Sequence, residues 1–258
     1  MPKARAYTAY FDTGGSESHP DVLVTAGAVS TSDKWARLDR KWLSVLETHG
    51  VSTLHMMELA HWKGEYSKWN RDETIRRAFL EDLSDVIARE VNKAFVYCLL
   101  LPDYRNVDSQ YMLSEQIGGP YSLLQTVALI DVFSWALKRG QSKDRYGAIV
   151  ELGDAGQDAF RKYFSSNESL MPTFHPKRLP SGEPVTPLSV CDWIAYEHRL
   201  LYSRALPQRR LPPQDKWRGS LRNLRNRVPF DSKIFETPFL LEFCRKLNVP
   251  PRVQKGAA

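Results

Sequence analysis

The sequence predicts an α/β or α+β protein, because strand-like and helix-like patterns alternate along most of its 258 residues. Residues 5–12 and 22–29 alternate and are rich in β-forming residues, so we expect two strands joined by a Gly- and Ser-rich turn. With 42% of its residues apolar, the chain can bury a substantial core. It shows no internal repeat, so we expect one large domain, or one domain with an appendage.

Hydrophobic spacing predicts the remaining elements. They are, in order, helix 35–46, a short strand-like piece 51–55, helix 75–87, strand 94–101, helix 120–137, strand 146–150, a helix carrying Phe160 and Phe164, helix 188–201 and a short helix 239–247. Residues 62–70, 102–119 and 165–187 have loop-like compositions, and the chain beyond Pro207 is basic and interrupted by prolines.

The cysteine pattern and the hydropathy exclude several classes of protein. Cys98, Cys191 and Cys244 are odd in number, widely spaced and without a CxxC pair, which argues against disulfides and a thiolate zinc site. Cys98 lies in an apolar run, so we expect it to pack in the core. The sequence also lacks a signal-peptide core, an apolar run long enough to span a bilayer, and the common phosphate-loop and nucleophile motifs. We therefore expect a cytoplasmic protein with no membrane partner.

The net charge of +6 is unevenly distributed, with a basic stretch from Arg199 to Arg227 that contains the single acid Asp215. This asymmetry indicates an anionic partner, although a solvated helical face explains it equally well. For a nucleic-acid partner, RNA or DNA, Trp217 is a candidate for stacking on a base. The candidate phosphate contacts, expected to form one face beside the acidic site, are Arg209, Arg210, Arg218, Arg222 and Arg225.

Carboxylates occur where backbone geometry can aim them at a common point. Asp12 and Glu151 end predicted strands, Glu58 follows the piece 51–55, and Asp154 lies in a turn. Asp192 opens a helix inside an apolar stretch. Carboxylates in such positions suit divalent cations, which prefer oxygen ligands. Two such ions about 4 Å apart can activate a water molecule and stabilise the leaving oxygen of a phosphodiester.

Ordinary structural interpretations of these residues remain open. Asp12 suits a turn, Glu58 an exposed surface, and Asp154 a helix N-cap. Asp192 is harder to explain in this way, because an acid among apolar helix residues is costly unless it is paired or ligated. His55 is either a metal ligand or proton-transfer group, or a histidine hydrogen-bonded near a strand end.

Four segments resemble, in order, motifs of the bacterial family known as domain of unknown function 3800. They are residues 10–15 (Tyr-Phe-Asp-Thr-Gly-Gly), 55–59 (His-Met-Met-Glu-Leu), 149–154 (Ile-Val-Glu-Leu-Gly-Asp) and 187–197 (Pro-Leu-Ser-Val-Cys-Asp-Trp-Ile-Ala-Tyr-Glu). The likeness covers roughly residues 5–205, and the last segment is its most specific part. Thr13 stands where the family usually has Glu, and Cys191 where it usually has Ala.

That family is similar to the RNase H-like superfamily, so the resemblance implies an RNase H-like mixed sheet flanked by helices. We expect this domain over residues 1–205, with residues 206–258 as a basic helical extension packed on or beside it. Together with the acidic residues, this fold leads to the hypothesis of a nuclease that hydrolyses phosphodiester bonds with Mg²⁺ or Mn²⁺. Its catalytic residues would be Asp12, Glu58, Glu151, Asp192 and His55. The metal ligands would be Asp12, Glu58, Asp192 and either Glu151 or Asp154, between which the sequence does not decide. The alternative is a non-catalytic module on the same scaffold that binds nucleic acid or a protein partner.

Overall fold

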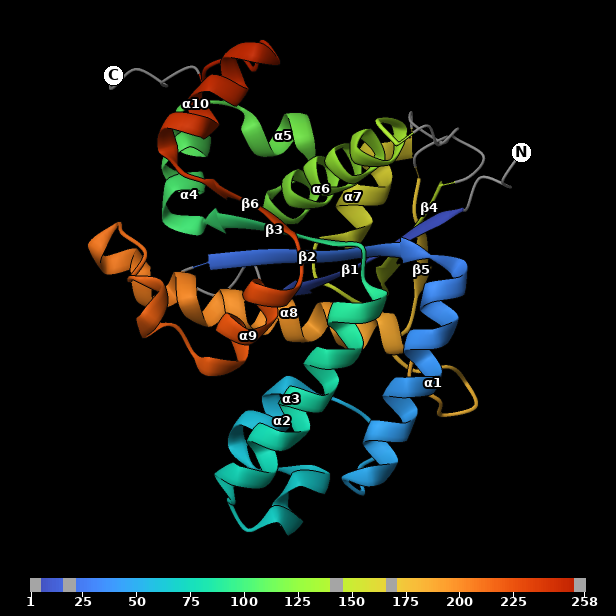
Figure 1. The fold of residues 1–258 in the computed structure, drawn as a ribbon. Coiled ribbons are helices and arrows are strands. Elements are labelled where there is room, and N and C mark those ends of the chain that lie inside the picture. Colours follow the sequence, from blue (N-terminus) through green and yellow to red (C-terminus); the bar gives the residue numbers. More distant parts are fainter. Residues whose placement is uncertain (1–5, 16–21, 140–145, 166–170, 253–258) are drawn as a thin grey trace.

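The computed structural model describes residues 6–15, 22–139, 146–165 and 171–252. Within these residues, a six-stranded sheet in the order β5-β4-β1-β2-β3-β6 lies between two layers of helices (Figure 1). The strands are β1 (Tyr7–Gly14), β2 (Val22–Thr31), β3 (Lys93–Leu100), β4 (Tyr146–Glu151), β5 (Thr173–His175) and β6 (Phe230–Phe235).

The strand directions define the fold. β1, β2 and β3 form an antiparallel meander, and β4 then pairs parallel to β1 on the other side, followed by β5 parallel to β4. Phe11 pairs with Gly27 across β1 and β2, and a side chain at Gly27 would collide with the Phe11 ring, which fixes this register. The predicted mixed sheet flanked by helices is confirmed.

Two hydrophobic cores lie on opposite faces of the sheet, because successive side chains of a strand point to opposite sides. β2 is buried at every position, as expected for a central strand. The helices over one face are α1 (Ser32–Thr48), α2 (Met56–His61), α3 (Glu73–Glu90), α8 (Thr186–Ala205) and α9 (Gly219–Arg227). Those over the other face are α4 (Leu101–Gln110), α5 (Leu113–Ile117), α6 (Pro120–Leu137), α7 (Gln157–Phe164) and α10 (Thr237–Lys246) (Figure 1).

Several segments differ from their predicted structure. Residues 51–55 are not a strand, because the Tyr66 hydroxyl donates to Thr53 O and accepts from His55 N, backbone groups that a strand would pair. Tyr66 belongs to a 3₁₀ helix, η1 (Gly64–Trp69), where a loop was predicted. Residues 102–119 contain α4 and α5, and α4 has a proline in its first turn, where its missing N–H costs nothing.

The C-terminal region is more than a helical extension. Besides α9 and α10 it contributes β6, which pairs parallel with β3 at the edge of the sheet. β6 exposes three consecutive polar residues, Asp231, Ser232 and Lys233, and ends in the buried Phe235, as expected for an edge strand.

The three cysteines are buried, and the described helices do not include a membrane span. Cys98, Cys191 and Cys244 are buried and unpaired, and the predicted packing role of Cys98 is confirmed. None of the helices in the described ranges is both long and apolar enough to cross a bilayer.

A buried histidine makes the stability of the fold depend on pH. His198 of α8 is 0% exposed, with Nδ1 2.8 Å from Ile194 O. Its Nε2 is buried without a hydrogen-bond partner among the described residues. Burial lowers the pKa of His198 to about 3; the Ile194 carbonyl opposes this shift and the Arg225 charge adds to it.

We expect the stability to fall as the pH drops below the ordinary histidine pKa, because the unfolded chain then binds a proton that the folded state excludes. This cost is about 2 kcal/mol at pH 5. In His198→Phe the loss between pH 7 and pH 5 should shrink by that amount, measured by urea unfolding at both pH values. Equal pH dependence of the two proteins would show that His198 is not the responsible group.

Candidate active site

Three carboxylates from different parts of the chain meet at one ammonium group. Lys177 Nζ lies 3.3 Å from Asp12 Oδ2, 3.0 Å from Glu151 Oε2 and 3.3 Å from Asp192 Oδ1. β1 and β4 are parallel neighbours, so their C-terminal ends bring Asp12 and Glu151 to the same edge of the sheet. We call Asp12, Glu151, Asp154, Asp192 and Lys177 the acidic centre.

Close packing of α8 on β1 positions Asp192. The Cys191 thiol donates a hydrogen bond to Tyr10 O at 3.1 Å, so the residue beside Asp192 is fixed to β1. A Cβ at Gly14 would touch Ala195 of α8 at 3.4 Å, which shows how little room the contact leaves. Asp192 also accepts a hydrogen bond from Met56 N at 3.1 Å, which ties the start of α2 to the centre.

The C-terminal end of β1 contributes the carboxylate of Asp12 alone, because its neighbour is Thr13. Thr13, which stands at the position of the expected second acid, is buried, and its hydroxyl lies 3.1 Å from the Thr25 hydroxyl. Gln125 of α6 donates to the same oxygen at 2.9 Å. Thr13 therefore belongs to a buried hydrogen-bond network beneath Asp12.

The carboxylates hold more negative charge than Lys177 neutralises. Asp12 is 3% exposed, and burial, reinforced by the adjacent Glu151, raises its pKa to about 8 against the opposing effect of Lys177. Burial and the Asp12 charge raise the pKa of Asp154 to about 7, and the same two causes raise that of Asp192. Burial alone would lower the pKa of Lys177, but Asp12, Asp192 and Glu151 raise it well above its ordinary value.

This excess of negative charge suits an added cation. Asp154 Oδ2 is buried without a hydrogen-bond partner among the described residues, and protons would otherwise have to neutralise the cluster. Within the described ranges, however, no three His, Cys, Asp or Glu side chains already form a metal-binding group. The Lys177 ammonium lies among the carboxylates at 3.0–3.3 Å, whereas Mg²⁺ binds oxygen at about 2.1 Å. The donor atoms therefore fit a hard divalent ion, which would have to displace or adjoin Lys177.

Glu58 and His55 lie at the rim of this site rather than inside it. His55 Nδ1 is 3.6 Å from Glu58 Oε1, and both side chains are more than two-fifths exposed. Neither contacts Lys177, and α2 reaches the acidic centre through the hydrogen bond from Met56 N to Asp192. The structure thus brings Asp12, Glu151 and Asp192 together, with Asp154 beside them and Glu58 and His55 outside.

The five candidate arginines do not form the single face that the sequence suggested. Arg209 pairs with Asp103 of α4 at 2.7 Å, and Arg210 follows it in the chain. Arg218 pairs with the buried Glu197 at 3.3 Å. Arg222, farther along α9, donates to Asp215 O at 3.1 Å.

Arg225 and Trp217 face inward, so their predicted contacts with nucleic acid are not supported by their positions. The Arg225 guanidinium lies over the rings of Trp217 and Phe230, at 5.6 and 4.8 Å from their centres. Trp217 is only 9% exposed and packs with Leu201 and Leu221, which leaves no free face for stacking on a base.

Two residues of the site region were not predicted from the sequence. Lys177 lies just after the three-residue strand β5, inside a segment with loop-like composition. Glu197 of α8 is 0% exposed; Ser220 donates to its Oε1 at 2.6 Å, and burial raises its pKa in spite of Arg218. For Glu197 a signal was present, since it is an acid within a mostly apolar helix.

Comparisons with known proteins give a likeness in structure but none in sequence. No family model and no curated protein sequence matches the chain. Among solved structures, the chain is similar to a chain of the PCNA:RNase HII complex from Archaeoglobus fulgidus, with a TM-score of 0.38 and 14% sequence identity. The match covers 97% of this chain and 96% of the other. The resemblance to the 3800 family stays a prediction.

Proposed function

We propose that the protein is a nuclease that hydrolyses phosphodiester bonds with the help of Mg²⁺ or Mn²⁺. The observation that carries this proposal is the convergence of Asp12, Glu151 and Asp192 on one point, with raised pKa values at Asp12 and Asp192. Carboxylates that are this crowded are stabilised by a bound cation.

In this proposal Asp12, Glu151 and Asp192 would hold the ion, with Asp154 beside them as a further ligand. Such an ion, when bound, makes a water molecule a usable nucleophile near neutral pH and stabilises the leaving oxygen. His55 would move a proton near the leaving group. Its Nδ1 is turned toward Glu58, so Nε2 is the atom available for this role.

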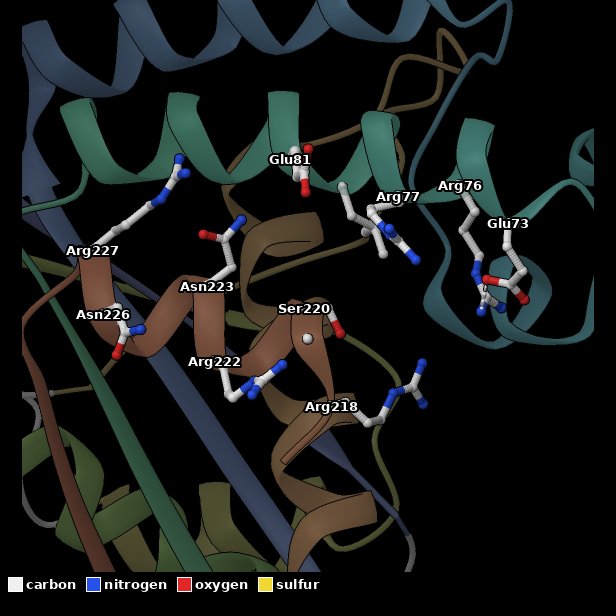
Figure 2. Close-up of a pocket in the computed structure, with 12 residues that line it drawn as sticks. Glu73, Arg76, Arg77, Glu81, Arg218, Ser220, Arg222, Asn223, Asn226 and Arg227 are labelled. Atoms are coloured by element: carbon white, nitrogen blue, oxygen red, sulfur yellow. Dashed lines mark hydrogen bonds and ion pairs between the residues drawn. The ribbon is translucent and has the colours of Figure 1, made fainter. Parts of the chain in front are cut away.

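The partner in this proposal is RNA or DNA, held through its phosphates. Arg218 and Arg222 are the best placed of the candidate arginines, because Figure 2 draws both along one pocket. Arginine suits this role, since its planar guanidinium can bind two phosphate oxygens at once.

One observation favours a second candidate function. The Lys177 ammonium already occupies the point where Asp12, Glu151 and Asp192 meet. If it is a permanent counter-ion, the protein would be a non-catalytic module that binds nucleic acid or a protein partner on the same scaffold.

Hydrolysis of labelled oligonucleotides tests the proposal. We expect cleavage of RNA, DNA or a hybrid with Mg²⁺ or Mn²⁺, and none with a chelator. Glu58→Gln should lower the rate by about 10- to 100-fold, less than the loss of a ligand, because the Glu58 carboxylate lies beside His55 and does not contact Lys177. Cleavage that continues in the presence of chelator, or no cleavage of any substrate, would contradict the proposed metal-dependent nuclease. The non-catalytic binding module would then be the better explanation.

A further inference from the structure

A pocket of about 880 Å³ lies along the contact between α3 and α9, and none of the carboxylates of the acidic centre lines it. Figure 2 shows Arg76 and Arg77 extending from α3, and Arg218 and Arg222 from the α9 side, around the same open space. Arg227 lies at the far end of α9, and the acids lining the pocket are Glu73 and Glu81. We call this pocket the α3–α9 groove.

Part of the positive charge in the α3–α9 groove is not neutralised within the protein. Arg76, Arg218 and Arg227 have acidic partners, which are Glu73, Glu197 and Asp85. Within the described residues, in contrast, Arg77 makes no ion pair, and the side chain of Arg222 bonds only to a backbone carbonyl, Asp215 O. Both are exposed, so their charges are available to a ligand.

Two arginine side chains lie between the groove and the end of β1. A Cβ at Gly15, three residues after Asp12, would lie 3.5 Å from the Arg199 side chain. Arg199 and Arg218 both lie against the ring of Tyr196, at 5.9 and 5.8 Å from its centre. Arg199 and Arg218 therefore lie between the end of β1 and the groove, in contact with the same ring of Tyr196.

We propose that the α3–α9 groove binds the phosphodiester backbone of a nucleic acid, and that Arg199 and Arg218 lead the strand toward the acidic centre. Guanidinium groups bind phosphate oxygens in pairs, and several of them around a groove of this volume match several successive phosphates rather than one. Binding itself depends only on the groove. Guidance of the strand toward the acidic centre, in contrast, rests on the nuclease function proposed above.

Binding without cleavage tests the groove. The full chain is titrated, in chelator, into fluorescently labelled single-stranded RNA, single-stranded DNA and duplex DNA, and anisotropy is recorded over a range of salt concentrations. In Arg77→Gln/Arg222→Gln, neither change leaves a buried acid unpaired, so the fold should survive. We expect weaker binding to every sequence. The slope of the logarithm of the binding constant against the logarithm of the salt concentration should be smaller in magnitude by about two, one for each phosphate that the variant no longer neutralises.

The matched control is Lys138→Gln/Lys162→Gln, which removes two exposed charges, one just after the end of α6 and one from α7, on the opposite face of the sheet. The control should bind as tightly as the wild type and with the same salt slope. Equal losses in the two double variants would indicate a net-charge effect and overturn the proposal, as would unchanged binding in the Arg77/Arg222 variant. Displacement of the oligonucleotide by inorganic phosphate at equal phosphate concentration would overturn it too, since a single phosphate would then suffice.

The two proposals fail separately. Metal-dependent cleavage that is unaffected by Arg77→Gln/Arg222→Gln would refute binding in the groove and support the nuclease function. The opposite result is salt-dependent binding that the same variant weakens, with no cleavage under any metal condition. It would support binding in the groove and refute the nuclease function.

Discussion

Asp12→Asn and Asp192→Asn should each abolish metal-dependent phosphodiester hydrolysis while the protein remains folded. An amide keeps the shape of the carboxylate but removes the charge that would attract the ion. Changes in the shell around metal ligands typically lower activity by 10- to 100-fold, and loss of a ligand should cost more than that. The rates are measured with labelled oligonucleotides in Mn²⁺, and folding is checked by circular dichroism. Hydrolysis that persists in both variants would refute the mechanism but not the fold.

The same Asp12→Asn change should stabilise the metal-free protein near neutral pH. The Asp12 carboxyl has a pKa of about 8 in the folded state and close to its ordinary value when unfolded. Between these values the unfolded chain releases a proton that the folded chain keeps, so wild-type stability falls as the pH rises. Between pH 4 and pH 8 in chelator, we expect Asp12→Asn to gain about 5 kcal/mol in stability relative to the wild type, at about 1.4 kcal/mol per pH unit. A destabilised variant at pH 8 would show that Asp12 is charged and well paired.

Lys177→Met should have an equally large effect, in the opposite direction. Methionine is similar in length but carries no charge, so Asp12, Glu151 and Asp192 lose their shared partner. Breaking a buried ion pair in this way costs about 3–5 kcal/mol, which we expect as a loss of stability in the metal-free protein. Mn²⁺ should then raise the melting temperature more in the variant than in the wild type, because the ion no longer competes with the ammonium.

Lys162→Met on α7 is the control for Lys177→Met, since Lys162 is exposed and its replacement removes one charge at a distance from the acidic centre. It should change neither the stability nor the response to Mn²⁺. If Mn²⁺ stabilises neither the wild type nor Lys177→Met, the acidic centre does not bind the ion, and the non-catalytic module becomes the better explanation.

The strand ends and the helix of the acidic centre could be predicted from sequence because local patterns determine them. Asp12 and Glu151 follow strongly β-like runs, and Asp192 stands out within an apolar helix. Parallel pairing of β1 with β4 then brings the first two together, which the resemblance to an RNase H-like sheet implied.

The positions of the Lys177 and Arg225 side chains depend on tertiary contacts that local sequence patterns do not encode. Lys177 follows a strand of only three residues, too short to show a periodicity, so nothing in the sequence indicates that it points at Asp12. Arg225 looks like any basic residue of a polar helix, and its inward position depends on where the rings of Trp217 and Phe230 lie. The same is true of Arg77, which joins the groove only because α3 packs against α9.

The parallel pairing of β6 with β3 has a consequence for synthesis on the ribosome. β3 is buried along almost its whole length, and in the finished molecule its outer edge is covered by a strand that emerges much later. Until then a nascent chain carries an apolar strand whose free N–H and C=O groups can pair with another chain. Truncation before Phe230 should therefore produce aggregates rather than a smaller version of the same domain.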